Sequence, residues 1–216
     1  GDAAYRLNFF AAVCGAATLA VVARGVREMG GSSWGGLLSA AMLGLSPTFW
    51  VQSTTANIRS LTALCTALCL WLTLRWERRR ETRWLTLLGL CFGLGVGHHS
   101  SLALLGAPLL ALVLIRDPRL ILSPRRWLGA VGALLASLLI LLYLPIRSAM
   151  HPAFDPTPIR TFSDFASHVL ATGFRGDMLY FHTWAELWQR GGVWLNIIMV
   201  QFGPWLAGGT LLALPL

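Results

Sequence analysis

Long apolar runs with few charges divide the whole chain. Charged residues make up only 12% of the sequence, whereas a soluble domain carries about 25%. Most of the runs approach the roughly 20 apolar residues that a helix needs to cross a bilayer. The sequence therefore predicts an all-α fold, a polytopic transmembrane helix bundle of about seven spans. The predicted spans are Leu7–Ala23, Ser33–Val51, Ile58–Trp76, Trp84–Gly97, Leu102–Ile115, Trp127–Leu144 and Val193–Leu214.

Arginines separate these runs. All seventeen basic residues are arginines, and eleven of them lie in three segments, at 24–33, 75–83 and 116–126. Basic residues in short loops remain on the cytoplasmic side of a membrane, so these three segments are predicted to be cytoplasmic. The outer face then receives the N-terminus, residues 52–57, the turn at 98–101 and residues 147–192. Because the arginines do not gather on one soluble face, we do not expect nucleic-acid binding.

A glycine stripe leads into a polar turn. Gly89, Gly93 and Gly97 recur at every fourth residue, a spacing that lets a neighbouring helix approach closely in a membrane. His98, His99, Ser100 and Ser101 follow directly, before another apolar run leaves in the opposite direction. Polar groups in such a place are costly unless they are wetted, paired or functional.

The outer segment, residues 147–192, carries two capping signatures. Thr161 with Asp164, and Thr183 with Glu186, have the spacing of a capping box. Each precedes apolar residues at helical spacing, which predicts two amphipathic helices that lie on the membrane surface. The sequence thus divides into residues 1–146 with six spans, the outer segment 147–192, and a final transmembrane helix at 193–216.

Two remaining features concern the cysteines and the start of the chain. Cys14, Cys65, Cys69 and Cys91 all lie inside apolar runs and are interpreted as small buried hydrophobic residues. Neither a further cysteine pair nor a nearby histidine completes a metal site. Residues 1–8 lack the basic start of a signal peptide, so we expect the sequence to begin inside a longer protein.

Polar residues that call for an explanation gather on the predicted outer face. If the spans form a bundle, three separate parts of the chain deliver these residues to one outer mouth, where cations would suit a lipid phosphate. Ordinary roles also fit: two histidines in a wet turn, or arginines that reach the interface along their apolar stems. The candidate donor-binding and phosphate-binding residues are Asn57, Arg59, His98, His99, Arg147 and Asp155.

Several motifs together resemble a known membrane-protein family. It is a bacterial multi-pass family, formerly a domain of unknown function, that is related to the transmembrane protein O-mannosyltransferases of the GT-C glycosyltransferase class. The resemblance covers nearly the whole chain. The motifs are GDAAYRLNFFAA at 1–12, ANIRSLTALCTALCLWLTLRW at 56–76, GLGVGHHSSL at 93–102, YLPIRS at 143–148 and FDPTPIRTFSDFASHVLATGFRG at 154–176.

The resemblance implies a transferase that takes a mannose-like sugar from a polyprenyl-phosphate donor on the outer face of the bacterial cell membrane. It implies an acidic general base in a first outer loop, which together with the first span is expected to precede Gly1. The catalytic residue is therefore unassigned here. His98, Arg147 and Asp155 fall on positions that match the family pattern, whereas family members carry Glu-Val-Tyr in place of Asn57-Ile58-Arg59. A divalent metal and the lipid-linked sugar are the cofactors left open.

A second hypothesis stands beside the enzyme. The departure at Asn57 and Arg59, together with the small-residue stripes, also suits a non-catalytic scaffold or lipid-binding subunit derived from such an enzyme. Its partners would be membrane lipids and other membrane-protein subunits. A transporter is less favoured, because the spans show no inverted repeat and hold no buried acidic residue for ion coupling.

Overall fold

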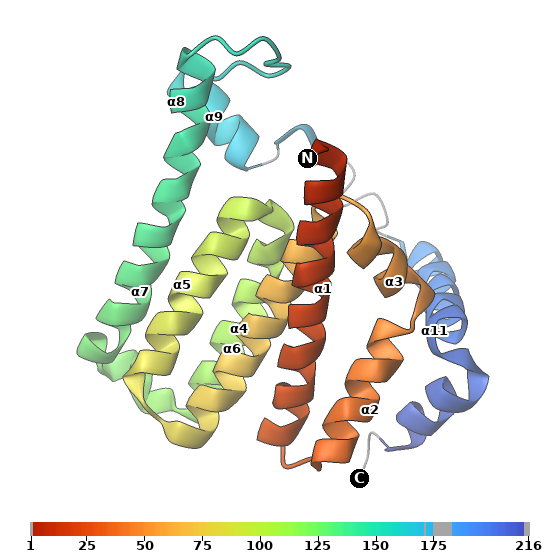
Figure 1. Ribbon diagram of the computed structural model, residues 1–216. Coiled ribbons are helices and arrows are strands. Elements are labelled where there is room, and N and C mark those ends of the chain that lie inside the picture. Colours follow the sequence, from red (N-terminus) through yellow and green to blue (C-terminus); the bar gives the residue numbers. More distant parts are fainter. Residues whose placement is uncertain (1, 171, 175–182, 214–216) are drawn as a thin grey trace.

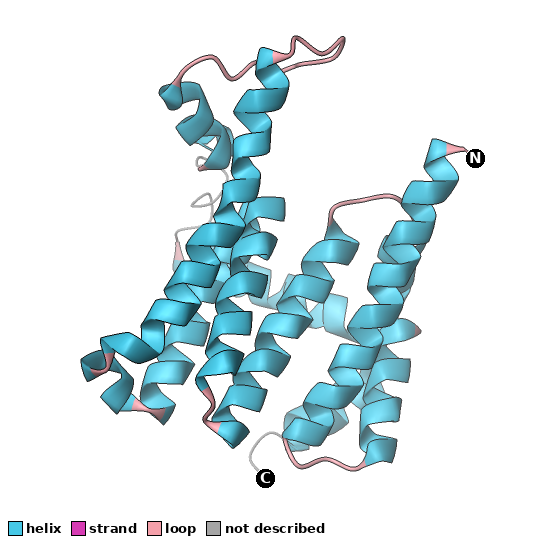
Figure 2. Cartoon of the chain, turned by 60° about the vertical axis from the view of Figure 1, so that its left-hand side comes forward, coloured by secondary structure: helices cyan, strands magenta, loops and turns pink. Residues whose placement is uncertain are grey.

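The computed structural model describes residues 2–170, 172–174 and 183–213, with side chains described as far as residue 204. Within these ranges all regular structure is helical (Figures 1 and 2). This confirms the all-α prediction.

The first three helices form one side of the molecule. Helix α1 (Ala3–Glu28) begins at Asp2, whose side chain accepts a hydrogen bond from the backbone of Ala4 at 3.0 Å. Helix α2 (Ser33–Gly44) runs back along α1, and α3 (Pro47–Thr54) follows at an angle (Figure 1). A proline suits the first position of a helix because its nitrogen has no hydrogen to donate. Pro47 therefore starts a new helix inside the predicted span Ser33–Val51.

The centre of the molecule holds the hydrophobic core. It lies between α4 (Arg59–Arg79), α5 (Thr82–His98) and α6 (Gly106–Arg116), with the 3-10 turn η1 (Ser100–Leu105) before α6. Cys69 and Trp76 have no exposed surface, and Leu85 and Val113 are buried beside them. Cys14 and Cys65 are buried as well, which confirms that these cysteines act as small hydrophobic residues.

A long apolar segment packs against α5. It combines α7 (Pro124–Leu138), the 3-10 turn η3 (Leu139–Leu142) and α8 (Tyr143–Ala149), and a further 3-10 turn, η2 (Pro118–Leu122), precedes it. A Cβ atom on Gly93 would lie 2.8 Å from the carbonyl oxygen of Leu134, and one on Gly97 would lie 2.8 Å from a methyl carbon of Ile140. The glycine stripe is therefore the contact face for this neighbour, as the sequence predicted.

The last described part begins with a short amphipathic helix. Helix α9 (Phe162–Val169) has the predicted capping box between Thr161 and Asp164, and η4 (Thr172–Phe174) follows it. Helix α11 (Trp184–Ala213) includes the second predicted amphipathic segment, so the prediction of a separate helix there was wrong. The reason is continuity: residues 184–202 remain helical until Gly203, with a φ of 75°, interrupts the helix before Pro204.

The expected number of spans is not reached. Among the described residues two helical segments are long and apolar enough to cross a membrane, α1 and Pro124–Ala149. They become three if α3 and α4, which meet at a bend of 115°, count as one broken span. The prediction of seven was wrong because helices end inside the apolar runs. At about 1.5 Å per residue, the 12 residues of α2 and the 11 of α6 fall short of the ~30 Å hydrocarbon core. Residues 214–216 of the last predicted span lie outside the described ranges.

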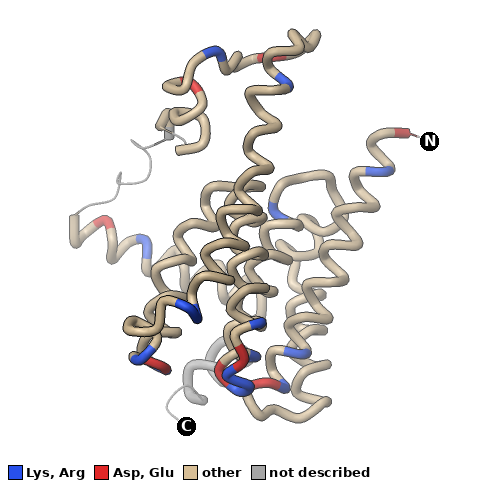
Figure 3. The backbone as a smooth tube through the Cα atoms, turned by 90° about the vertical axis from the view of Figure 1, so that its left-hand side faces the viewer, with Lys and Arg blue, Asp and Glu red and all other residues tan. Residues whose placement is uncertain are grey.

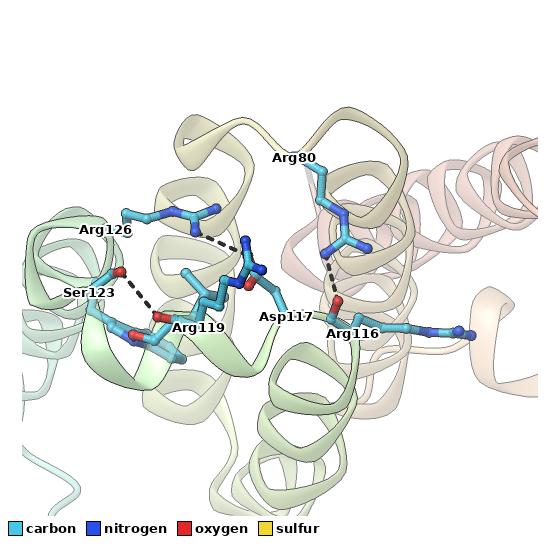
Figure 4. Close-up of polar contacts among 8 residues, drawn as sticks. Arg80, Arg116, Asp117, Arg119, Ser123 and Arg126 are labelled. Carbon is cyan, nitrogen blue, oxygen red and sulfur yellow. Dashed lines mark hydrogen bonds and ion pairs between the residues drawn. The ribbon is translucent and has the colours of Figure 1, made fainter.

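The three arginine-rich segments lie at one end of the helices, here called the basic end (Figure 3). Glu28 of α1 pairs with Arg75 and Arg78 of α4, and Glu77 pairs with Arg116 at 3.0 Å. Figure 4 shows that the guanidinium of Arg80 donates to the Arg116 carbonyl at 3.0 Å, and that Arg126 pairs with Asp117. The sequence grouped these segments correctly on one side.

Candidate functional site

The polar turn lies at the opposite end of the helices, here called the histidine end. His98 is the last residue of α5, and His99 takes an extended conformation that leads the chain into η1. The ring Nε2 of His98 lies 3.1 Å from the Ile58 carbonyl oxygen. A carbonyl oxygen only accepts, so this nitrogen donates. The bond fastens the histidine turn to the residues that open α4.

His99 bonds back to its own turn. Its Nδ1 accepts a hydrogen bond from the backbone of Ser101 at 3.3 Å and lies 2.6 Å from the Ser101 hydroxyl oxygen. Because Nδ1 accepts, the proton of the neutral ring resides on Nε2, which leaves one donor for another partner. The turn therefore fixes both the orientation and the tautomer of this ring.

Asn57 uses its whole side chain to start α4. Its Nδ2 donates to the carbonyl oxygens of Gln52 and Thr55, each at 2.7 Å. Its Oδ1 accepts from the backbone nitrogens of Arg59 at 2.7 Å and Ser60 at 3.3 Å. An amide side chain has two donors and one oxygen with two lone pairs, so all its hydrogen-bonding capacity is used. Asn57 therefore fixes the backbone at the first residues of α4, including that of Arg59.

Arg59 and His99 line the same cavity. This cavity has a volume of about 610 Å³ and lies among α1, α2, α3, α4 and η1. Most of its wall is apolar, and its polar residues are three threonines together with Arg59, His99 and Ser101. The threonines are Thr18, Thr62 and Thr66. Arg59 is exposed and makes a long contact, 3.4 Å, from its Nη1 to Gln52. We call this space the apolar cavity.

A second cavity shares His99 with the first. It has a volume of about 800 Å³ and is lined by His98, His99, residues 156–159 of the outer segment, and α9. Asp164 and His168 of α9 face it as well. We call this space the outer cavity. His99 thus belongs to the walls of both cavities.

Arg147 and Asp155 lie apart from this pair of cavities. Asp155 accepts a hydrogen bond from the Ser148 hydroxyl at 2.7 Å, and Ser148 in turn accepts from the backbone of Ile159 at 2.9 Å. The carboxylate thereby fixes the loop that supplies residues 156–159 to the outer cavity. Arg147 is exposed on α8 and lines neither cavity. Arg59, His98 and His99 are therefore gathered at the cavities with Asn57 bonded to the backbone of Arg59, and Arg147 and Asp155 are not.

The sequence reading missed Asp164 and His168 as cavity residues. Asp164 was recognised as a helix cap, and His168, four residues later, lies on the same helix face, which was the available signal. The Thr161 hydroxyl and the backbone N–H groups of Arg160 and Thr161 hold the pKa of Asp164 below its ordinary value. A carboxylate with a lowered pKa is a weak base, so capping is its evident role.

Two helices of membrane-crossing length, with two cavities that share His99 at one end, are the features of a helical membrane protein with a candidate site at its histidine end. The sequence profile of one family, the protein O-mannosyl-transferase TMEM260 N-terminal domain, matches residues 1–120. The chain belongs to this family, which confirms the relation to O-mannosyltransferases. No curated protein and no solved structure matches the chain. The matched range holds Asn57, Arg59, His98 and His99, the gathered residues.

Proposed function

We propose that this chain is part of a GT-C glycosyltransferase that takes a mannose-like sugar from a polyprenyl-phosphate donor at the histidine end. One observation carries the proposal: His99 lines both the apolar cavity and the outer cavity. A lipid-linked sugar has an apolar chain, a phosphate and a polar sugar in that order. The apolar cavity suits the polyprenyl chain, and the outer cavity suits the sugar and its acceptor. The region around His99 and Arg59, here called the junction, suits the phosphate.

The junction has the right charge for a phosphate. Arg59 brings a permanent positive charge, and the free Nε2 of His99 brings a hydrogen-bond donor. Hydrogen bonds between a cation and a phosphate oxygen are roughly twice as strong as neutral ones. In this proposal Asn57 orients Arg59, and Asp155 shapes the loop above the sugar. Arg147 stands further out on α8, where it meets the acceptor rather than the phosphate.

The reaction is a displacement at the anomeric carbon of the sugar. The acceptor hydroxyl oxygen forms the new bond to this carbon, and the bond from carbon to the phosphate oxygen breaks. The polyprenyl phosphate leaves with the electron pair, and a general base takes the hydroxyl proton, a contribution of typically 10²–10⁴-fold in rate. Cations at the junction stabilise the charge that develops on the leaving phosphate. This base is not assigned to a residue of this chain.

The setting of the reaction follows from the arginine distribution. We place the basic end on the cytoplasmic side and the histidine end on the outer face of a bacterial cell membrane, since basic loops remain cytoplasmic. The donor and membrane lipids are then the partners at the histidine end, and the exposed apolar helices leave room for further membrane subunits.

Replacing Arg59 tests the phosphate junction. Arg59→Met keeps an apolar stem of similar length and removes the charge, so we expect the affinity for a polyprenyl-phosphate mannose to fall by roughly 10-fold to 100-fold. The measurement is a binding titration of the purified protein with this donor. Arg6→Met is the matched control, because Arg6 is also exposed but lines neither cavity. Equal affinity of the two variants would contradict the junction.

A non-catalytic lipid-binding subunit is the second candidate function. The observation in its favour is that the amide of Asn57 is fully engaged and Arg59 follows it, where relatives of the suggested bacterial family carry Glu-Val-Tyr. Arg59→Met and its control Arg6→Met distinguish the enzyme from the non-catalytic subunit when both donor binding and sugar transfer are measured. The enzyme requires that Arg59→Met lowers both quantities. A subunit requires that donor binding falls while the assembled system transfers sugar at its normal rate.

A further inference from the structure

The basic end contains a cavity that the proposed transfer reaction does not use. Its volume is about 580 Å³ and it lies between the ends of α1 and α4. We call it the basic cavity. Its wall is formed by Arg24, Arg27, Glu28, Trp71, Arg75, Arg78 and Arg79.

The charges around this cavity are not balanced. Five guanidinium groups face one carboxylate, and that carboxylate, Glu28, is already paired with Arg75 and Arg78. Every other carboxylate of the basic end has an arginine of its own, in the pairs at Glu77, Glu81 and Asp117. Arg24, Arg27 and Arg79 therefore lack a carboxylate partner among the residues that the structure describes.

Part of the wall is buried and fixed. The side chain of Glu28 is only 11% exposed, and the guanidinium of Arg75 lies 5.2 Å from the ring centre of Trp84. The Nε of Arg75 and the Nε1 of Trp71 are buried N–H groups without a hydrogen-bond partner among the described residues. Buried N–H groups that lack a partner among the described residues also occur on Trp76 and Trp84, which lie outside the cavity wall, so the excess of arginines is the feature that distinguishes the cavity.

A general explanation accounts for part of this pattern. Arginines in the last turns of α1 and α4 offset the negative ends of the helix dipoles, and basic loops suit the cytoplasmic side. Neither effect requires two helices to place five arginines around a single cavity. This convergence is what a multivalent anion needs, because several charge-assisted bonds can form at once.

We propose that the basic cavity binds the phosphate headgroup of an anionic phospholipid. The cavity lies where α1, one of the two membrane-length helices, reaches its polar end. This is the depth of lipid headgroups, and basic pockets between membrane helices are a recurrent way to hold them. The apolar outer surface of α1 would lie beside the acyl chains. This inference does not depend on the proposed sugar transfer.

Two double variants with equal charge test the proposal. Arg24→Gln with Arg79→Gln removes two cavity arginines that have no carboxylate partner in the described residues. Arg119→Gln with Arg125→Gln removes two arginines of the same end that lie outside the cavity. Both variants keep the Glu28 pairs intact, and thermal unfolding in detergent confirms that both fold.

The measurement is native mass spectrometry of the full chain in detergent, titrated with phosphatidylglycerol, with phosphatidylcholine as the uncharged comparison. The wild type and the variant of Arg119 and Arg125 should retain phosphatidylglycerol, and the variant of Arg24 and Arg79 should bind it roughly 30-fold more weakly. Equal loss in both variants would show diffuse surface attraction and overturn the proposal. Displacement of the lipid by inorganic phosphate would overturn it too, since it would identify a site for free anions.

Discussion

His99 occupies the position on which the two cavities depend. Its backbone is extended, its Nδ1 is held by Ser101, and its ring contributes to both walls. Beside it, His98 donates a hydrogen bond to the Ile58 carbonyl, which links the turn to the start of α4. Two adjacent histidines thus have different roles. His98 connects two segments, and His99 faces the cavities.

The capping carboxylate Asp164 makes the outer segment sensitive to acid. Its pKa is lowered from 3.8 in the folded protein, chiefly by the Thr161 hydroxyl and then by backbone N–H groups. A carboxyl with a lowered pKa contributes stability above its ordinary value and loses that contribution as the pH falls through the folded value. We therefore expect the protection of the amides at the start of α9, relative to the intrinsic exchange rate, to fall as the pH drops below 3.8.

Hydrogen exchange measured by NMR or mass spectrometry over this pH range checks the effect. Asp164→Asn carries no titratable group at this position. Its protection at the start of α9, relative to the intrinsic exchange rate, should therefore not fall with acid. Thr161→Ala removes the largest cause of the shift, so its transition should move up toward pH 3.8. An unchanged transition in Thr161→Ala would refute the assigned cause.

At the residue scale, the sequence showed which polar residues are candidates for a site, but it did not show which of them lie close together. Asn57, Arg59, His98 and His99 stand out because polar groups interrupt apolar runs. The last three line the cavities, and Asn57 bonds to the backbone of Arg59. Arg147 and Asp155 stand out for the same reason, yet Asp155 bonds to Ser148 and Arg147 projects from α8. His168 escaped notice because a histidine on an amphipathic helix has no distinctive pattern. Which polar residues share a cavity depends on packing between distant segments.

At the scale of the elements, the close packing of α5 against α7 depends on the glycines of α5. A side chain at Gly93 would meet the Leu134 carbonyl oxygen at 2.8 Å and also the Ser137 hydroxyl. Backbone atoms cannot move aside easily, so only hydrogen fits at this position. The glycine stripe could be interpreted from sequence because a four-residue repeat on a helix has a direct geometric meaning.

Gly93→Ala should therefore destabilise the protein by about 1–3 kcal/mol, the usual cost of overpacking. The matched control is Gly132→Ala on α7, where a Cβ atom would meet nothing within 4 Å. That control should be neutral or stabilise by up to ~1 kcal/mol, because alanine favours helix. Denaturant unfolding in detergent measures both. If the two variants proved equally stable, the close contact of α5 with α7 would be wrong.

Helix ends were harder to predict than helices. An apolar run shows where a chain avoids water, but it does not show where a helix stops. Pro47 divided one predicted span into α2 and α3, and the 3-10 turn Ser100–Leu105 occupies the first residues of the predicted span Leu102–Ile115. The second capping box, at Thr183, began a long helix rather than a short surface one. In each case local backbone geometry decided the outcome.

The whole molecule places its arginine-rich segments at one end and the two cavities that share His99 at the other. Ion pairs join the arginine-rich segments at the basic end, while Arg59, His98 and His99 meet at the histidine end. The positions of the arginines along the sequence predicted this division, because the prediction needs only the order of the loops. It could not anticipate the basic cavity, which requires the ends of α1 and α4 to lie side by side.

The central claim is that the histidine end holds the phosphate of a polyprenyl-phosphate sugar. Photo-crosslinking tests it most directly, with a donor analogue that carries a diazirine beside the phosphate and with peptide mapping of the labelled sites. We expect labels within residues 58–62 and 98–101, and we expect excess unlabelled donor to remove them. Labels confined to the basic end, at residues 24–28 and 75–79, would contradict the account.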